Sequence, residues 1–218
     1  MRQAAGAEVA GAGAGVRSTT GGNGRNGRAA YDLPAVLDIA VTAFNDYGYD
    51  ATSMGLLAER LGTSKSAVYY HVSGKEDLLR LALERALGAL EGILSLPGAT
   101  DGPAEDRLRF VLRGAVQVLV DDLPYVTLLL RLRGNTEIER SALERRRAFD
   151  HAVSRLVDQA RDEGSLRTDV DSGTITRLLF GMINSIVEWY KPGGTLTPGR
   201  LADDVISVAF DGLHRPIA

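Results

Sequence analysis

The stretch TSMGLLAERLGTSKSAVYYHV, residues 52–72, holds two short segments with helical spacing and a glycine, Gly62, between them. Thr52 stands where it can cap the first segment, and Thr63 or Ser64 can cap the second. A side-chain oxygen at such a position accepts a hydrogen bond from a free backbone N–H of the first turn. Two short helices joined by a turn that contains glycine are the elements of a helix-turn-helix.

The residues that such a motif needs for packing also stand at suitable places. Ala58 is small where the two helices would cross, and Gly62 follows four residues later, where the turn needs a positive φ. Val68 comes six residues after Gly62 and supplies an apolar side chain that faces back. Leu57 and Leu61 complete a shared core. The alternative interpretation of this spacing is an ordinary helical hairpin inside a bundle.

The outward face of the second helix favours DNA recognition over a bundle, because its polar and aromatic side chains cannot all be buried. We expect Lys65 to reach base edges, with Ser66 as a second candidate. Tyr69 and His71 are expected to contact phosphates, whereas Tyr70 is the tyrosine that could pack inward against the first helix. The full set of predicted DNA-binding residues is Thr52, Ser53, Thr63, Ser64, Lys65, Ser66, Tyr69, Tyr70, His71 and Lys75.

The net charge of −3 argues against a nucleic-acid partner unless the cations are well placed. Residues 1–30 carry four arginines against one glutamate, a net charge of +3, whereas residues 31–94 carry five Lys or Arg against nine Asp or Glu, a net charge of −4. Helix N-termini also attract anions, so helix ends and hydroxyl groups can supply part of the phosphate contact. We interpret the Gly/Ala-rich residues 1–30 as a disordered arm whose arginines could add DNA contacts.

Beyond residue 30, the long segments have helical rather than alternating periodicity, which predicts an all-α fold. Pro34 suits the first turn of a helix that ends at Gly48. Ser73 and Glu76 form a Ser-x-x-Glu capping box for a longer helix that ends near Leu94. Further helices are expected at 103–122, 124–132, 138–163, 172–190 and 198–213.

Residues 35–79 closely resemble the N-terminal domain of the TetR family of one-component repressors. The matching residues are Ala40, Phe44, Gly48, Tyr49, Thr52, Ala58, Leu61, Gly62, Ser64, Lys65, Tyr69, Tyr70, His71, Lys75, Glu76 and Leu78. Two residues depart from the pattern: Val72 stands where phenylalanine is usual, and Gly55 costs its helix about 1 kcal/mol.

The resemblance implies a homodimer with one helix-turn-helix in each subunit and a helical domain that binds a small effector. It also implies a repressor rather than an activator. Because a dimer of this motif must match the spacing of two half-sites, we predict that the effector changes the separation of the two recognition helices through helix 75–94. The chain then divides into the arm (1–30), a helix-turn-helix DNA-binding domain (31–80) and an effector-binding and dimerisation domain (81–218).

In the family, the final two helices pair with those of the second subunit, and here both expected helices carry apolar stripes with small residues between. Internal core packing is the alternative explanation for part of each stripe. The predicted dimer interface comprises Leu178, Met182, Ser185, Ile186, Val205, Val208, Ala209 and Gly212.

The run GMINSIVEWYKPGGTLTPGRLADD, residues 181–204, resembles the corresponding segment of family members that respond to acyl-CoA thioesters. Trp189 could stack on an adenine or line an acyl channel, and arginines could meet the CoA phosphates. A hydrophobic drug or metabolite is the other candidate effector, and plain core or dimer packing also explains Trp189 and the leucines. The predicted effector-binding residues are Tyr125, Leu129, Arg131, Leu132, Arg133, Arg177 and Trp189.

The sequence offers no catalytic constellation, metal site or cofactor motif. Cysteine is absent, and His71, His151 and His214 lie far apart without metal-ligand spacing. We interpret the arginines at 145–147 as a solvated helix face. The start lacks the apolar core of a signal peptide and no apolar run is long enough to span a membrane, so a cytoplasmic protein is expected. The competing hypothesis is a helical small-molecule carrier or interaction protein without operator binding.

Overall fold

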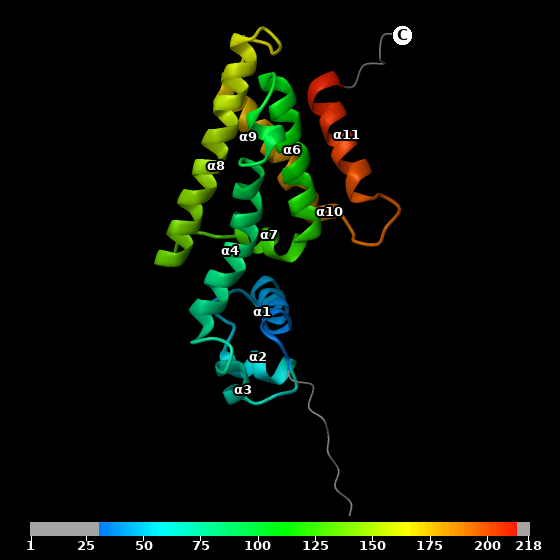
Figure 1. Cartoon of the computed structure of the whole chain (residues 1–218). Coiled ribbons are helices and arrows are strands. Elements are labelled where there is room, and N and C mark those ends of the chain that lie inside the picture. Colours follow the sequence, from blue (N-terminus) through cyan, green and yellow to red (C-terminus); the bar gives the residue numbers. More distant parts are fainter. Residues whose placement is uncertain (1–30, 213–218) are drawn as a thin grey trace, which may run out of the picture. The chain divides into compact units, whose positions relative to one another are not determined.

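A computed structural model describes residues 31–212 of the chain, which fold into eleven α-helices with no strand among them (Figure 1). The prediction of an all-α fold is confirmed. The predicted arm, residues 1–30, lies outside the described residues. The helices are α1 (Leu33–Tyr47), α2 (Met54–Arg60), α3 (Lys65–Tyr69), α4 (Lys75–Ile93), α5 (Pro97–Thr100), α6 (Ala104–Asp121), α7 (Leu123–Leu130), α8 (Glu137–Asp162), α9 (Ser172–Asn184), α10 (Ile186–Trp189) and α11 (Pro198–Asp211).

The first three helices form a small cluster at the N-terminal end of α4 (Figure 1). Helix α1 begins as expected with Pro34 in its first turn, where the Asp32 carboxylate accepts a hydrogen bond from the Ala35 amide at 3.0 Å. It ends at Gly48, whose φ of 87° suits glycine. Its buried face packs against α2, α4 and α7.

The start of α4 differs from the predicted capping box. The helix begins one residue later than the Ser73 cap requires, with Gly74 at the N-cap and no side-chain cap. This register places Asp77, not Glu76, at the third helical position, and the Asp77 carboxylate accepts from the Ser73 amide at 3.2 Å. Helix α4 then runs unbroken across the predicted domain boundary at 80/81. The described residues belong to one compact unit, Tyr31–Ala218.

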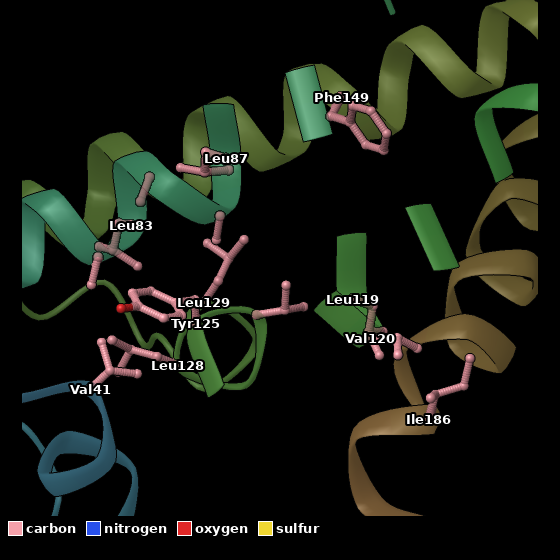
Figure 2. Packing of buried hydrophobic residues seen from close by; sticks show 14 of the residues in the cluster. Val41, Leu83, Leu87, Leu119, Val120, Tyr125, Leu128, Leu129, Phe149 and Ile186 are labelled. Atoms are coloured by element: carbon pink, nitrogen blue, oxygen red, sulfur yellow. The ribbon is translucent and has the colours of Figure 1, made fainter. Parts of the chain in front are cut away.

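The C-terminal helices pack around α6, which contacts α4, α8 and α11. Buried apolar side chains from α4, α6, α7, α8 and α10 meet in the continuous core shown in Figure 2. The segment 172–190 is not one helix as predicted. It breaks at Ser185, whose hydroxyl donates to the Met182 carbonyl at 2.7 Å. No helix within residues 31–212 is long and apolar enough to cross a membrane.

Candidate DNA-binding surface and effector pocket

The turn between α2 and α3 is fixed by backbone hydrogen bonds around a glycine. Gly62 adopts a φ of 61°, its amide donates to the Glu59 carbonyl at 2.9 Å, and the Thr63 amide donates to the Ala58 carbonyl at 2.9 Å. This pair of bonds is the Schellman arrangement, which satisfies the last carbonyls of a helix. The turn therefore sets the angle at which α3 leaves α2.

In helix α3, only Val68 points toward the protein core, and the other side chains point outward. Val68 is buried against Leu57 and Leu61, while Lys65, Ser66 and Tyr69 are exposed. The Ser64 hydroxyl caps the helix by accepting from the Ala67 amide at 3.3 Å. The outward face thus presents hydroxyl groups, an ammonium group and an aromatic ring.

The expectation that Tyr70 packs inward is wrong, because its side chain is 86% exposed. Two helical residues after the buried Val68, its side chain must point away from the core. Its ring instead meets the half-buried His71 edge-on, with the ring centroids 5.3 Å apart.

Thr52 is also placed differently from the prediction. It is 1% exposed, and its hydroxyl donates to the carbonyls of Gly48 at 2.8 Å and Ala43 at 3.3 Å. Its side chain therefore cannot contact DNA. The cap of α2 is the exposed Ser53, whose hydroxyl accepts from the Leu56 amide at 3.2 Å.

Lys75 stands at the first position of α4, where its ammonium group is engaged by the chain itself. Nζ donates to the Tyr49 carbonyl at 2.8 Å and lies 4.3 Å from the centroid of the Tyr49 ring. A second contact reaches the Asp50 carbonyl at 3.3 Å. In this position Lys75 holds the connection between α1 and α2 against α4, rather than projecting toward a duplex.

The structure gives a reason for Gly55, which sequence reasoning treated only as a departure from the family pattern. A Cβ atom at Gly55 would lie 2.9 Å from Cε and 3.3 Å from Nζ of Lys65. The Lys65 side chain therefore lies across the first turn of α2, and the missing Cβ leaves room for it. The local sequence signals did not indicate this close approach of Lys65 to Gly55.

The substitution Gly55→Ala is expected to displace Lys65 and to weaken operator binding by roughly 5- to 10-fold, part of the value of one base contact. The free energy of unfolding should not fall, because alanine favours a helix more than glycine does. Gly92→Ala in α4 is the matched control, since nothing lies within 4 Å of its added Cβ. Fluorescence anisotropy with an operator duplex and urea unfolding measure the two effects. Equal affinity for wild type and variant would contradict the role given to Gly55.

An open pocket of about 790 Å³ lies between α8 and α9, and we call it the outer pocket. Four arginines line it, Arg146, Arg147, Arg155 and Arg177, together with His151 and with Asp150 as the one carboxylate. None of the four guanidinium groups takes part in an ion pair with a carboxylate within residues 31–212. The outer pocket is therefore suited to an anionic group.

A much smaller space of about 30 Å³, the inner cavity, adjoins the outer pocket. Arg146, Asp150, Phe180 and Asn184 line both, so they mark the passage between them. The remaining lining is apolar and comes from α4, α6, α7, α8 and α9. Burial raises the pKa of the Asp150 carboxyl, against the opposing effect of nearby Arg146 and His151. The outer pocket, which is lined by charged side chains, thus leads to the mainly apolar inner cavity.

The structure divides the predicted effector residues among several places. Leu129 lines the inner cavity and Arg177 the outer pocket, but Arg131, Leu132 and Arg133 line a separate groove between the end of α1 and the α7–α8 connection. Trp189 is half exposed and lines neither the outer pocket nor the inner cavity.

Tyr125 is buried, and it joins helices rather than lining either space. Its hydroxyl donates to the Asp38 carboxylate of α1, and the Arg85 guanidinium of α4 stacks 4.1 Å from its ring centroid. Burial and the bond to Asp38 raise the pKa of Tyr125. In addition, the Asn45 amide of α1 donates to the Pro124 carbonyl at 2.8 Å. Helix α7 therefore contacts α1 on one side and lines the inner cavity on the other.

The interpretation of residues 145–147 as one solvated face does not hold, since even the exposed Arg147 lines the outer pocket. Arg146 lines both spaces, and Arg145 binds Glu91 of α4 through two bonds of 2.8 and 2.7 Å. It also donates to Glu84 at 2.6 Å. The bonds from Arg145 lower the pKa of the Glu91 carboxyl. Helix α8, which lines the outer pocket, is thereby bound to α4, the helix that follows the N-terminal cluster of α1, α2 and α3.

The predicted dimer residues separate into surface and core. Leu178 is 67% exposed and Val208 43% exposed, and Ser185 and Gly212 are exposed as well. Met182 and Ala209 are partly buried. Ile186 and Val205, at 0% and 7% exposed, belong to the core of the subunit because they point toward it from their helices. These two cannot form a dimer surface in this conformation.

Comparison with known proteins gives matches over most of the chain. The family model "Bacterial regulatory proteins, tetR family" matches residues 36–82, and "Tetracyclin repressor-like, C-terminal domain" matches residues 101–213. The HTH-type transcriptional repressor KstR2 of Rhodococcus jostii is 24% identical over 204 residues, which cover 89% of this chain and 95% of that protein.

Solved structures are similar over the same region. The crystal structure of a TetR transcriptional regulator family member from Streptomyces coelicolor A3 is 51% identical, with a TM-score of 0.78, covering 83% of this chain and 91% of that chain. The structure of AibR in complex with isovaleryl coenzyme A and operator DNA is 24% identical, with a TM-score of 0.69, covering 81% of this chain and 97% of that chain, and shares the fold.

Proposed function

The chain belongs to the TetR family of transcriptional regulators, and on that premise we propose that its effector is a coenzyme A thioester held jointly by the outer pocket and the inner cavity. The protein is a ligand-responsive repressor that binds operator DNA, and family membership sets aside the carrier and enzyme hypotheses.

The observation that carries the effector proposal is the junction of a cationic pocket with an apolar cavity. Coenzyme A carries a diphosphate and a ribose phosphate. Guanidinium groups form bidentate hydrogen bonds with phosphate, so these groups suit Arg146, Arg147, Arg155 and Arg177. The acyl group at the other end is apolar and suits the inner cavity. A lipophilic drug would leave the guanidinium groups without anionic partners. The fold neighbour AibR, which binds isovaleryl coenzyme A, is consistent with this class.

The same contacts give a route from the effector to the operator. A thioester that contacts Arg146 can move α8, which Arg145 binds to α4. An acyl group in the inner cavity contacts α7, which Tyr125 binds to α1. Helix α1 contacts both α4 and α2, and α2 in turn contacts the recognition helix α3. Because a dimer must match the spacing of two half-sites, a small change in the separation of the two α3 helices suffices to release the operator.

The substitution Arg177→Ala tests the proposed class, since it removes one phosphate-binding group and should weaken butyryl-CoA binding about 10-fold. For wild type, a hundredfold excess of ligand over its dissociation constant should raise Tm by about 5–10 °C, and the same ligand should release the operator in an anisotropy assay. Butyrate and a lipophilic drug serve as ligand controls.

Arg140→Ala is the matched variant, because Arg140 lies on α8 outside the outer pocket and pairs with Glu137. It should bind butyryl-CoA as wild type does. A Tm that rises with drugs but with no CoA thioester would overturn the proposed effector class.

A further inference from the structure

The inner cavity limits the size of what it can hold. A water-sized group needs about 10–15 Å³ of such space, so a cavity of about 30 Å³ has room for two or three groups of that size. The outer pocket, at about 790 Å³, is far larger. The apolar end of the ligand is therefore small even though the whole ligand is large.

The cavity walls are packed side chains rather than open surface. Leu119 of α6 and Leu129 of α7 are at most 2% exposed, and both appear with Phe149 of α8 in Figure 2. Phe149 packs on Phe180 of α9, with ring centroids 5.8 Å apart and planes inclined by 56°. Protein interiors of this kind are close-packed, so a larger group must displace side chains that already contact one another.

The passage into the cavity is polar, unlike its end. Asp150 and Asn184 lie at this passage beside Arg146. A thioester is the one polar group near the acyl end of the ligand, and the Asn184 side chain carries an amide N–H that can donate to its carbonyl oxygen. With the carbonyl at the passage, only the carbons beyond it enter the cavity.

We propose that this repressor responds to short-chain acyl-CoA thioesters whose acyl group has two or three carbons beyond the carbonyl, such as propionyl-, butyryl- or isobutyryl-CoA. The inference rests on the proposed function and narrows it. Long-chain acyl groups and acyl groups that carry fused rings exceed the space that the closed walls leave.

A chain-length series measured on the full-length protein tests the inference. Dissociation constants for CoA and its acetyl, propionyl, butyryl, octanoyl and palmitoyl thioesters are measured by isothermal titration calorimetry. Affinity should rise about fourfold for each added methylene up to butyryl, because each is removed from water. It should then fall at least tenfold for octanoyl- and palmitoyl-CoA.

Two variants change the cavity in opposite directions. Ala115→Val fills the cavity from α6 and should weaken butyryl-CoA at least tenfold more than acetyl-CoA. Leu90→Ala enlarges it from α4 and should move the optimum to longer chains. Leu81→Ala is the matched control, a partly buried leucine of α4 that does not line the cavity, and it should keep the wild-type series. Thermal unfolding confirms that each variant is folded.

The outcomes separate the two claims. Palmitoyl-CoA binding as tightly as butyryl-CoA, or a series with no dependence on chain length, would overturn the size inference and leave the effector class standing. A protein to which no CoA thioester of any length binds would overturn the proposed function, and this inference with it.

Discussion

Replacing Lys65, Tyr69 and Tyr70 together by alanine is expected to reduce operator affinity about a thousandfold. A lysine contact to a base edge contributes about 1–3 kcal/mol, and each tyrosine hydroxyl that donates to a phosphate about 1.5 kcal/mol. The sum is at least about 4 kcal/mol, which corresponds to a thousandfold change. All three side chains are exposed, Tyr69 by 51%. The free energy of unfolding should therefore change by no more than about 0.5 kcal/mol.

The salt dependence of binding separates the roles of these residues. If Lys65 contacts a base, Lys65→Ala relaxes the sequence preference at one position of the operator. If Lys65 contacts a phosphate instead, the same substitution reduces the magnitude of the slope of log K against log salt by about one unit. Lys191→Ala is the matched control, an exposed lysine that follows α10, and it should leave operator binding unchanged. Operator affinity of the triple variant within tenfold of wild type would show that another surface contacts the duplex.

The helix-turn-helix could be predicted from the sequence because local rules determine it. Gly62 has the positive φ that its position requires, and Val68 is the one buried residue of α3. Which residue caps each helix was harder to predict, because two neighbouring residues with hydroxyl groups can both accept a hydrogen bond from the first helical turn. Ser53 rather than Thr52 caps α2, because the Thr52 hydroxyl finds two carbonyl partners in the interior.

The outer pocket could not be predicted from the sequence because its residues meet only through tertiary contacts. Arg147, His151 and Arg155 are spaced four residues apart, so the sequence does place them on one helix face. What it does not show is that α9 lies beside this face and supplies Arg177 and Phe180. The same limit applies to Gly55, where a residue with low helix preference coincides with the close approach of the Lys65 side chain.

A charge on the exposed face of α9 is expected to separate the dimer. Leu178 is 67% exposed in the subunit and Val208 of α11 is 43% exposed, so both offer apolar surface to a second subunit. Along α9, Leu178 shares its side of the helix with the exposed Gly181 and Ser185, whose small size permits close approach of a second helix. We propose that this surface meets its copy in the second subunit.

Leu178→Asp should raise the dimer dissociation constant at least 100-fold. Burying one leucine contributes about 1.5–3 kcal/mol, and a symmetric interface loses that contribution twice, in addition to the cost of burying a carboxylate. The subunit should keep its fold because Leu178 is outside its core. Sedimentation velocity measures the dissociation, and operator affinity should fall with it, because separate subunits no longer bind two half-sites together.

Leu96→Asp is the matched control, since Leu96 is 48% exposed but belongs to the connection between α4 and α5 rather than to α9 or α11. It should remain dimeric. A dimeric Leu178→Asp variant that still binds the operator would place the interface on another face. The experiment also bears on the effector, because Arg177 and Gly181, which flank Leu178, line the outer pocket. If the second subunit covers this side of α9, it stands at the rim of the outer pocket, and a thioester bound there can alter the dimer geometry directly.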